Sequence, residues 1–209
     1  MNTDDYYGSE REDIIALIPS DARRVLDVGC GFGLMGKALK QKNSAIEVVG
    51  FETEEKAAEI AKKNIDKVIT GDVEGVKMPF ADRYFDCLVY GEVLEHLKDP
   101  WRVLKEHAPY LKKGGCCIVS MPNISHYSII EGLLKDKWDY KDAGILDSTH
   151  LRFFTINGIR KMLNDAGYII DEEKRYIRAS KVRKAIGKLL GRCAVHLLTE
   201  QYLIKGRLV

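Results

Sequence analysis

The chain has 209 residues, of which 45% are hydrophobic and 31% charged, and its formal net charge is +2. This length is typical of one domain, the apolar fraction suffices for a buried core, and no apolar run reaches the roughly 18 residues of a membrane-spanning helix. The acidic N-terminus lacks the basic and apolar segments of a secretory signal, so we expect a cytoplasmic protein.

The predicted elements alternate between strands and helices along the chain. Short apolar runs predict strands over residues 23–30, 47–52, 67–72, 83–93, 115–123, 168–176 and 200–209. Periodic and capping signals predict helices over residues 10–18, 33–41, 53–64 (with Thr53 as N-cap), 100–114, 155–167 and 179–197. We therefore expect an α/β fold in a single domain over residues 1–209, with a mostly parallel sheet and an insertion at residues 124–150.

The five cysteines do not suggest a disulfide framework, because their number is odd and their spacing irregular. No CxxC pair is present, which argues against a cysteine zinc site. We expect reduced thiols in the core at Cys30, Cys87, Cys116, Cys117 and Cys193.

Parallel sheets of this kind bind ligands at the carboxyl ends of their strands, so those positions carry the functional prediction. The first strand ends in Asp27-Val28-Gly29-Cys30-Gly31-Phe32-Gly33, where glycines allow a tight turn and close approach of a ligand. Residues 31–36 also fit GxGxxG, with Glu52 further on, which is the fingerprint of an NAD-binding oxidoreductase. That fingerprint begins two residues too late after the strand, so we favour the register that starts at Asp27.

The segment VLDVGCGFG at residues 25–33 resembles motif I of the class I S-adenosylmethionine (SAM)-dependent methyltransferases, and the resemblance runs over residues 6–176. It implies a Rossmann-like, seven-stranded, mostly parallel sheet with helices on both faces and an antiparallel last strand. It also implies that SAM is the cofactor and S-adenosylhomocysteine the product. The insertion at residues 124–150 would then form a lid over the acceptor.

The resemblance assigns cofactor contacts to the strand ends. Glu52 would accept both ribose hydroxyls, with Thr53 near the adenine, and Asp72 would accept from the adenine amino group, to which Val73 offers its backbone N–H. The residues expected beside the methionine part are Asp27, Gly29, Cys30, Gly31, Gly33, Tyr90, Gly91 and Glu92.

Two histidines are candidate catalytic bases for a hydroxyl acceptor, because imidazole titrates near neutral pH. His96 follows the fourth strand, and His150 lies in DSTHLRFFT, which resembles a segment of methyltransferases from bacterial glycan and secondary-metabolite pathways. We therefore expect a small-molecule or glycan-type acceptor, methylated at oxygen. A SAM-binding partner protein without turnover is an alternative.

A metal site is a further alternative. Glu92, Glu95 and His96 form an ExxEH pattern to which His150 would add a fourth ligand for Mg²⁺, Mn²⁺ or Zn²⁺. Similar patterns occur in ubiquinone-pathway O-methyltransferases and in small-RNA 3′-terminal 2′-O-methyltransferases. We favour a site without metal, because many relatives with EHL-x-DP need none and Glu92 is expected beside SAM.

Basic residues are concentrated near the C-terminus. Residues 174–209 hold ten of the 33 basic residues but one of the 31 acidic ones, and residues 179–197 predict an amphipathic basic helix. Contact with an anionic membrane surface or with nucleic acid is one interpretation. We favour packing on the sheet edge, because the strand predicted after this helix would hold it to the domain. The sequence gives no indication of an oligomeric state.

Overall fold

The computed structural model describes residues 10–177 and 192–209, and seven strands there form one sheet in the order β3-β2-β1-β4-β5-β7-β6. All neighbouring strands are parallel except β7, which runs antiparallel to both β5 and β6. This topology confirms the predicted Rossmann-like sheet with an antiparallel last strand. The strands are β1 (Arg24–Val28), β2 (Glu47–Glu52), β3 (Lys67–Thr70), β4 (Phe85–Gly91), β5 (Leu111–Pro122), β6 (Tyr168–Tyr176) and β7 (Gln201–Leu208).

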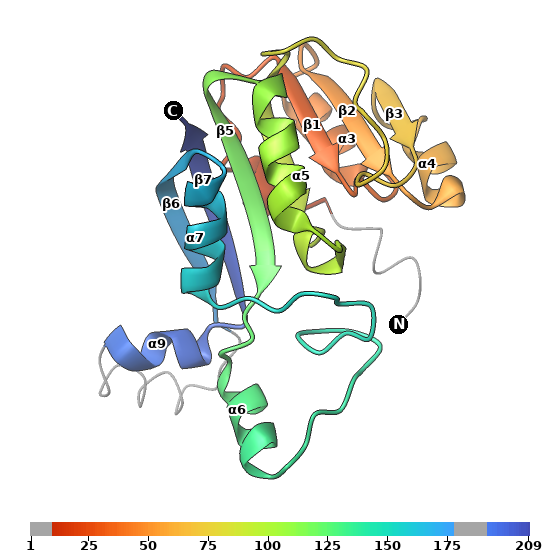
Figure 1. Ribbon diagram of the computed structural model, residues 1–209. Helices are drawn as coiled ribbons and strands as arrows, with labels where there is room; N and C mark the ends of the chain where they lie inside the picture. Colours follow the sequence, from red (N-terminus) through yellow and green to blue (C-terminus); the bar gives the residue numbers. More distant parts are fainter. Residues whose placement is uncertain (1–9, 178–191) are drawn as a thin grey trace.

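Helices cover both faces of the sheet, with α5 and α7 in front of it in Figure 1 and α3 behind it. The helices are α2 (Glu12–Ile15), α3 (Leu34–Lys42), α4 (Glu55–Ala61), α5 (Pro100–His107), α6 (Tyr127–Leu134), α7 (Ile156–Asp165) and α9 (Arg192–Leu198). Alternate residues of each strand point to opposite faces, so they enter two separate apolar clusters. In β4, Leu88 and Tyr90 pack with α5 and α7, whereas Cys87 and Val89 pack with α2 and α3.

Three predicted helices have different limits. The helix expected over residues 10–18 is confined to α2, Glu12–Ile15. The helix expected over residues 100–114 ends at His107, and β5 already begins at Leu111. Pro109 contributes to the early end, because proline has no N–H to continue the hydrogen bonds of the α-helix. The chain tightens there into a 3-10 turn, η2 (Ala108–Tyr110), before β5 begins. The expected N-cap Thr53 is wrong: Glu54 caps α4, and its side chain accepts a hydrogen bond from the Lys56 N–H.

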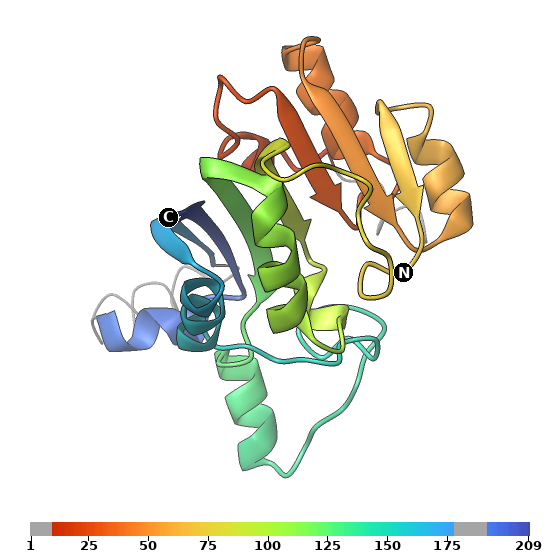
Figure 2. The same ribbon diagram turned by 45° about the horizontal axis from the view of Figure 1, so that its top comes forward.

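The insertion lies at the carboxyl edge of the sheet. The arrowheads of β1, β2, β3 and β5 point toward this edge, and α6 with the loop that follows it extends beyond the end of β5 (Figures 1 and 2). The backbone N–H groups of Leu151 and Arg152 donate to the Glu95 carbonyl at 2.8 and 2.9 Å, which ties the end of the insertion to the turn η1 (Leu94–His96) after β4.

Most of the basic helix predicted over residues 179–197 lies outside the described residues. Only its C-terminal part is described, as α9. Among the helices described over residues 10–177 and 192–209, none is long and apolar enough to cross a membrane.

Candidate cofactor and acceptor sites

A cavity of about 640 Å³ runs along the carboxyl ends of β1, β2 and β4, and we call it the donor cavity. Its volume lies within the usual range of about 300–1,000 Å³ for small-molecule sites. Most of the residues predicted to bind the cofactor line it: Asp27, Gly29, Cys30, Gly31, Glu52, Thr53, Asp72, Val73, Gly91 and Glu92.

Two predicted cofactor residues do not line the donor cavity. The Tyr90 side chain is fully buried in the core, and its hydroxyl lies 2.8 Å from Nδ1 of His107. This placement follows from the strand alternation, which directs Tyr90 to the same face as Leu88. Gly33 instead forms the N-cap of α3, where Ala61 of α4 lies close to its backbone. Neither residue lines the donor cavity, and their contacts with the cofactor stay predictions, for Tyr90 through its backbone.

The glycine loop is held in a conformation that other residues rarely adopt. Gly29, Gly31 and Gly33 have φ angles of 71°, 54° and 72°, in the left-handed region. The N–H groups of Gly29 and Cys30 both donate to the Phe51 carbonyl, at 2.7 and 3.1 Å. The loop is thereby fixed against the end of β2, with its backbone at the cavity wall.

Glu52 ends β2 with a buried carboxylate that faces this loop. One oxygen accepts the Gly31 N–H at 2.8 Å, and the other accepts the Glu54 N–H at 2.9 Å. Each carboxylate oxygen has a second acceptor position. The carboxylate is therefore oriented by the backbone and can still accept a pair of hydroxyl groups from the cavity.

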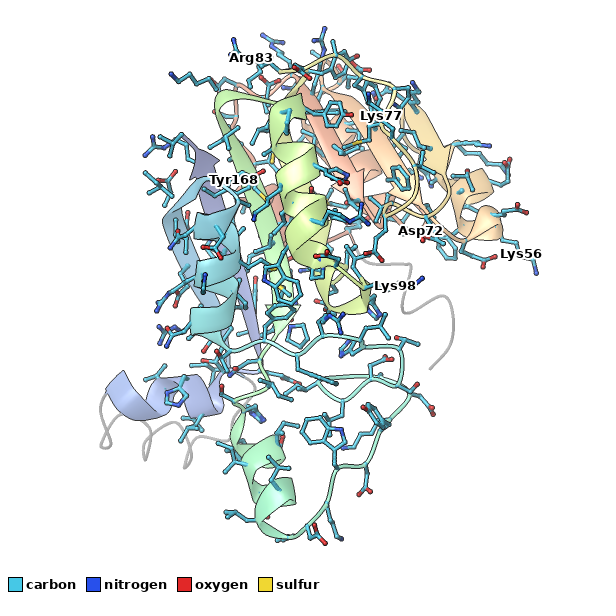
Figure 3. All side chains as sticks on the ribbon, in the orientation of Figure 1. Lys56, Asp72, Lys77, Arg83, Lys98 and Tyr168 are labelled. Atoms are coloured by element: carbon cyan, nitrogen blue, oxygen red, sulfur yellow. The ribbon has the colours of Figure 1, made fainter. Side chains whose placement is uncertain are left out.

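Two aspartates line the same cavity in different environments. Asp72 lies just after β3 (Figure 3), where its carboxylate accepts the Glu74 N–H at 2.9 Å in a local turn. Burial raises the pKa of Asp27 to about 7, the Glu52 charge adds to the rise, and Arg11 opposes it. Asp27 is therefore poised to change its charge near neutral pH.

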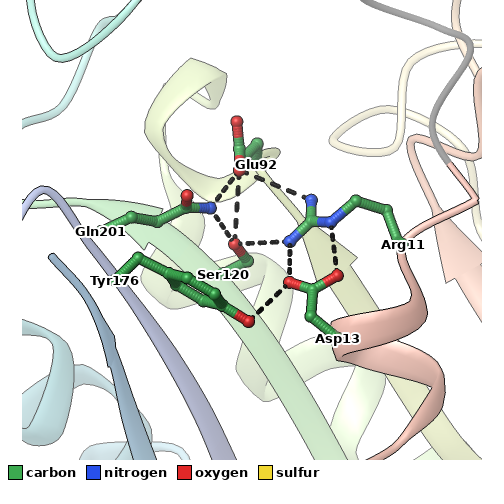
Figure 4. A network of polar contacts seen from close by, with 6 residues as sticks. All are labelled: Arg11, Asp13, Glu92, Ser120, Tyr176 and Gln201. Atoms are coloured by element: carbon green, nitrogen blue, oxygen red, sulfur yellow. Dashed lines mark hydrogen bonds and ion pairs between the residues drawn. The ribbon is translucent and has the colours of Figure 1, made fainter. Parts of the chain in front are cut away.

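A polar network of six side chains (Figure 4) borders the donor cavity, because five of its members line that cavity. The Arg11 guanidinium bonds Asp13 at 3.1 Å and the Ser120 hydroxyl at 3.0 Å, and it lies 3.4 Å from a Glu92 oxygen. Glu92 has a φ of 59°, an unusual backbone for glutamate that directs the end of β4 toward this network. The six side chains of the network are Arg11, Asp13, Glu92, Ser120, Tyr176 and Gln201.

Sequence reasoning missed four members of this network. Asp13, Ser120, Tyr176 and Gln201 come from α2, β5, β6 and β7. No local motif marks them, because they meet only where the antiparallel strand β7 lies between β5 and β6. The Tyr176 hydroxyl, for example, donates to Asp13 across 163 positions of the sequence.

A second cavity, of about 610 Å³, adjoins the first, and we call it the acceptor cavity. The two cavities share Glu92, His96, Tyr176 and Gln201 as lining residues. Residues 143–145 with Asp147 and His150, from the insertion, form another part of its lining. A molecule in the acceptor cavity would therefore lie beside one in the donor cavity.

The two candidate catalytic histidines meet at this shared wall. Their ring centroids are 4.7 Å apart, although His96 and His150 come from different segments. Nδ1 of His96 lies 3.1 Å from the Thr149 hydroxyl, and Nδ1 of His150 lies 3.0 Å from the Ile145 carbonyl. Burial lowers the pKa of His96, and the neighbouring His150 lowers it further.

Glu95 lies beneath the histidine pair. Its side chain is 1% exposed, and neither carboxylate oxygen has a hydrogen-bond partner. Burial raises the pKa of this carboxyl well above its usual range. Of the four ligands considered for a metal, the structure brings Glu95, His96 and His150 together, whereas Glu92 belongs to the polar network.

Comparisons with known proteins agree with this arrangement. A family model described as a methyltransferase domain matches residues 26–119, which hold the glycine loop and β1 to β4. The chain is 25% identical over 191 residues to a demethylmenaquinone methyltransferase of Thermotoga maritima, an alignment that covers 82% of each protein. The chain belongs to the class I SAM-dependent methyltransferases.

Other relatives of this methyltransferase match over shorter segments. The protein MJ1123 of Methanocaldococcus jannaschii is 31% identical over 146 residues, which cover 68% of this chain and 65% of that protein. A ubiquinone biosynthesis O-methyltransferase of Coxiella burnetii is 35% identical over 105 residues, which cover 48% of this chain and 44% of that enzyme. The chain thus spans less than two thirds of these two relatives.

Solved structures share the fold of this methyltransferase. A SAM-dependent methyltransferase from Archaeoglobus fulgidus superimposes with a TM-score of 0.72 at 19% identity, covering 98% of this chain and 96% of that one. A methyltransferase from Haloferax volcanii, in complex with the activator Trm112, gives a TM-score of 0.67 at 19% identity, covering 98% and 91%. At these identities the likeness concerns the fold alone.

The donor cavity of this methyltransferase fits its cofactor. The Glu52 carboxylate is held with acceptor positions toward the cavity, as a ribose requires. The glycine loop has no side chains at Gly29 and Gly31, so its backbone can approach the cofactor closely. The comparisons favour SAM over NAD as the cofactor, and an enzyme over a binding protein without turnover.

Proposed function

We propose that this methyltransferase transfers the methyl group of SAM to a hydroxyl oxygen of a small-molecule or glycan-type acceptor in the acceptor cavity. The observation that carries the proposal is the wall that the two cavities share, with His96 and His150 beside it. Methyl transfer requires that donor and acceptor are held in line and close together. Two adjoining cavities meet this requirement.

In this proposal the donor cavity orients SAM through named groups. Glu52 accepts the ribose hydroxyls, and Asp72 with the Val73 backbone holds the adenine. Thr53 lies beside the adenine, and the backbone of residues 29–31 and 91–92 flanks the methionine part. When bound, SAM supplies an electrophilic methyl group on a positively charged sulfur.

The histidine pair acts on the acceptor. An imidazole whose Nδ1–H is directed to a hydroxyl or carbonyl oxygen carries its lone pair on Nε2. We propose that Nε2 of His150 or His96 accepts the hydroxyl proton as the acceptor oxygen bonds the methyl carbon. The electron pair of the broken carbon–sulfur bond stays on sulfur, so S-adenosylhomocysteine leaves neutral at that atom.

A phenolic acceptor of the quinone-precursor type is the second candidate. Its support comes from the names of two relatives, a demethylmenaquinone methyltransferase and a ubiquinone biosynthesis O-methyltransferase. A phenol differs from a sugar hydroxyl in needing less help from a base, because it ionises near pH 10.

The test is a search for the methylated atom. The protein is incubated with SAM carrying a deuterated methyl group and with separate pools of phenols, sugar hydroxyls and amines, and products are analysed by mass spectrometry. We expect labelled oxygen, and we expect His150→Gln or His96→Gln to lower kcat about a hundredfold. His196→Gln on α9 is the matched control. Label found only on nitrogen would contradict the proposal.

A further inference from the structure

We propose that Glu95, His96 and His150 bind a divalent transition-metal ion at the wall between the donor and acceptor cavities. One ligand atom from each side chain lies within 4.8 Å of the others. Two imidazoles and one carboxylate suit zinc or iron, whereas magnesium prefers oxygen ligands alone. Among these metals we choose Zn²⁺ as the probe, because it has no redox chemistry.

The Glu95 carboxylate is the first reason for a cation here. It is 1% exposed, borders the acceptor cavity, and has no hydrogen-bond partner at either oxygen. A buried polar group without a partner destabilises a protein, and more so if it is charged. A metal ion would supply the missing partner for both oxygens.

The backbone holds Glu95 firmly in this position. Its carbonyl accepts the N–H groups of Leu151 and Arg152, at 2.8 and 2.9 Å, just after His150 in the chain. The same two bonds therefore hold the segment with His150 against the turn that carries Glu95 and His96. The three side chains meet because of a fixed contact between two segments.

The hydrogen bonds of both histidines are the second reason. The Thr149 hydroxyl lies 2.6 Å from an Asp147 oxygen, to which it donates, so it accepts from the His96 Nδ1–H. The His150 Nδ1–H donates to the Ile145 carbonyl at 3.0 Å. Histidines that bind metals through one nitrogen commonly donate from the other to a carboxylate, a backbone carbonyl or a water. His150 has such a carbonyl partner, and the Thr149 hydroxyl takes the corresponding place for His96.

The distances need only a small adjustment. Zinc bonds of about 2.0–2.2 Å place two tetrahedral ligand atoms about 3.4 Å apart. The ligand atoms now lie up to 4.8 Å from one another, so side-chain shifts of about 1 Å would bring them to zinc-binding distances. Three protein ligands leave a fourth position for water or substrate, as in catalytic zinc sites, and His96 and His150 both border the acceptor cavity.

Glu92 is excluded from this ligand set by its own contacts. Its side chain bonds Arg11, Ser120 and Gln201 in the polar network. The site therefore differs from the four-ligand ExxEH alternative, and Glu92 keeps its place beside the cofactor. With the metal bound, both Nε2 atoms are ligands and do not accept the proton, so the metal would take the place of the imidazole base in the proposed function. A hydroxyl bound at the open metal position would lose its proton to solvent more readily than a free one.

The experiment is a zinc titration of the full chain without a histidine tag, after treatment with EDTA and removal of the chelator. Isothermal titration calorimetry is expected to give one Zn²⁺ per chain. Glu95→Gln and His150→Gln should each weaken binding at least a hundredfold, and Thr149→Val about tenfold, because loss of a neighbouring partner typically costs ten- to a hundredfold. Glu106→Gln, an exposed change on α5, is the matched control.

A second probe reports which side chains bind. Co²⁺ added to the metal-free protein should give visible absorption bands that Glu95→Gln and His150→Gln both abolish, while their thermal unfolding stays cooperative. The proposal is overturned if no Zn²⁺ binds, if both variants bind as the unchanged protein does, or if Co²⁺ gives the near-ultraviolet bands of thiolate ligands.

The metal proposal and the proposed function fail separately. The same preparations are titrated with SAM in the absence of any metal. Protein that binds SAM but not Zn²⁺ overturns only the metal site, and activity that survives EDTA shows that imidazole alone accepts the proton. Protein that binds Zn²⁺ but not SAM overturns the proposed donor contacts and leaves the metal site standing.

Discussion

The Glu52 carboxylate offers the sharpest test of the donor cavity. Glu52→Gln keeps the size of the side chain but replaces one acceptor oxygen by an NH₂ donor. The two oxygens of Glu52 now accept the N–H groups of Gly31 and Glu54, at 2.8 and 2.9 Å. The amide oxygen can accept only one of these two N–H groups. The NH₂ group then faces the other N–H without a hydrogen bond, and it can no longer accept from a ribose hydroxyl.

The expected loss follows from those contacts. A hydrogen bond to a charged group contributes about 1.5–3 kcal/mol. Losing one such bond to the cofactor therefore raises the Kd for SAM about ten- to a hundredfold. The unpaired N–H in the glycine loop should also lower the unfolding free energy by about 1–3 kcal/mol.

The assay separates the two effects. Isothermal titration with S-adenosylhomocysteine gives the Kd, and urea unfolding of the same sample gives the stability. Glu55→Gln is the matched control, because Glu55 is the exposed first residue of α4 and lines neither the donor nor the acceptor cavity. A folded Glu52→Gln protein whose Kd stays within twofold of the unchanged chain would refute the ribose assignment.

Three further predictions concern the donor cavity and the core beside it. Gly29→Ala should weaken SAM binding at least tenfold and lower Tm, because φ is 71° and the new Cβ would lie 2.4 Å from a Val93 methyl group. Adding Val93→Ala should recover only part of the SAM affinity and Tm, since the left-handed backbone still costs about 1–2 kcal/mol. Burial raises the pKa of Asp27 to about 7, so its ionised form, which attracts the cationic cofactor, should gain population from pH 6 to 8; calorimetry should show affinity rising over that range, and Asp27→Asn should remove the rise. Burial lowers the pKa of His107 from 6.5 to about 4, so the unfolded chain takes up the proton first and the unfolding free energy should fall by about 3 kcal/mol from pH 7 to pH 4. His107→Gln, which can still accept from Tyr90, should flatten this slope in urea unfolding, and an unchanged slope would contradict the assignment.

The donor cavity was accessible to sequence reasoning because its residues follow directly after strands. Asp27, Glu52 and Asp72 each end or follow an apolar run, and parallel strands bring such positions to one edge of the sheet. Tyr90 marks the limit of this reasoning. It lies one residue before the end of β4, but the alternation of that strand directs its side chain into the core, and its spacing of two from Leu88 already indicated that face.

The tertiary structure alone decided how the acidic and histidine residues divide between sites. The sequence places Glu92, Glu95 and His96 in one short motif, but the Glu92 side chain bonds the polar network and is not part of the cluster of Glu95, His96 and His150. Glu92 joins Arg11 and Gln201, which come from distant segments. Glu95 and His96 join His150, which only the contact between the insertion and the turn after β4 brings near.

The sequence by itself determined the family, the order of strands and helices, and the glycine loop. These features depend on local periodicity and on backbone angles that few residues adopt, so they can be recognised along a single stretch of chain. The shared wall of the two cavities, the polar network around Arg11 and the buried Glu95 beside two histidines depend on contacts between segments far apart in the chain. Only the packing of β7 between β5 and β6, and of the insertion against the sheet edge, brings those groups together.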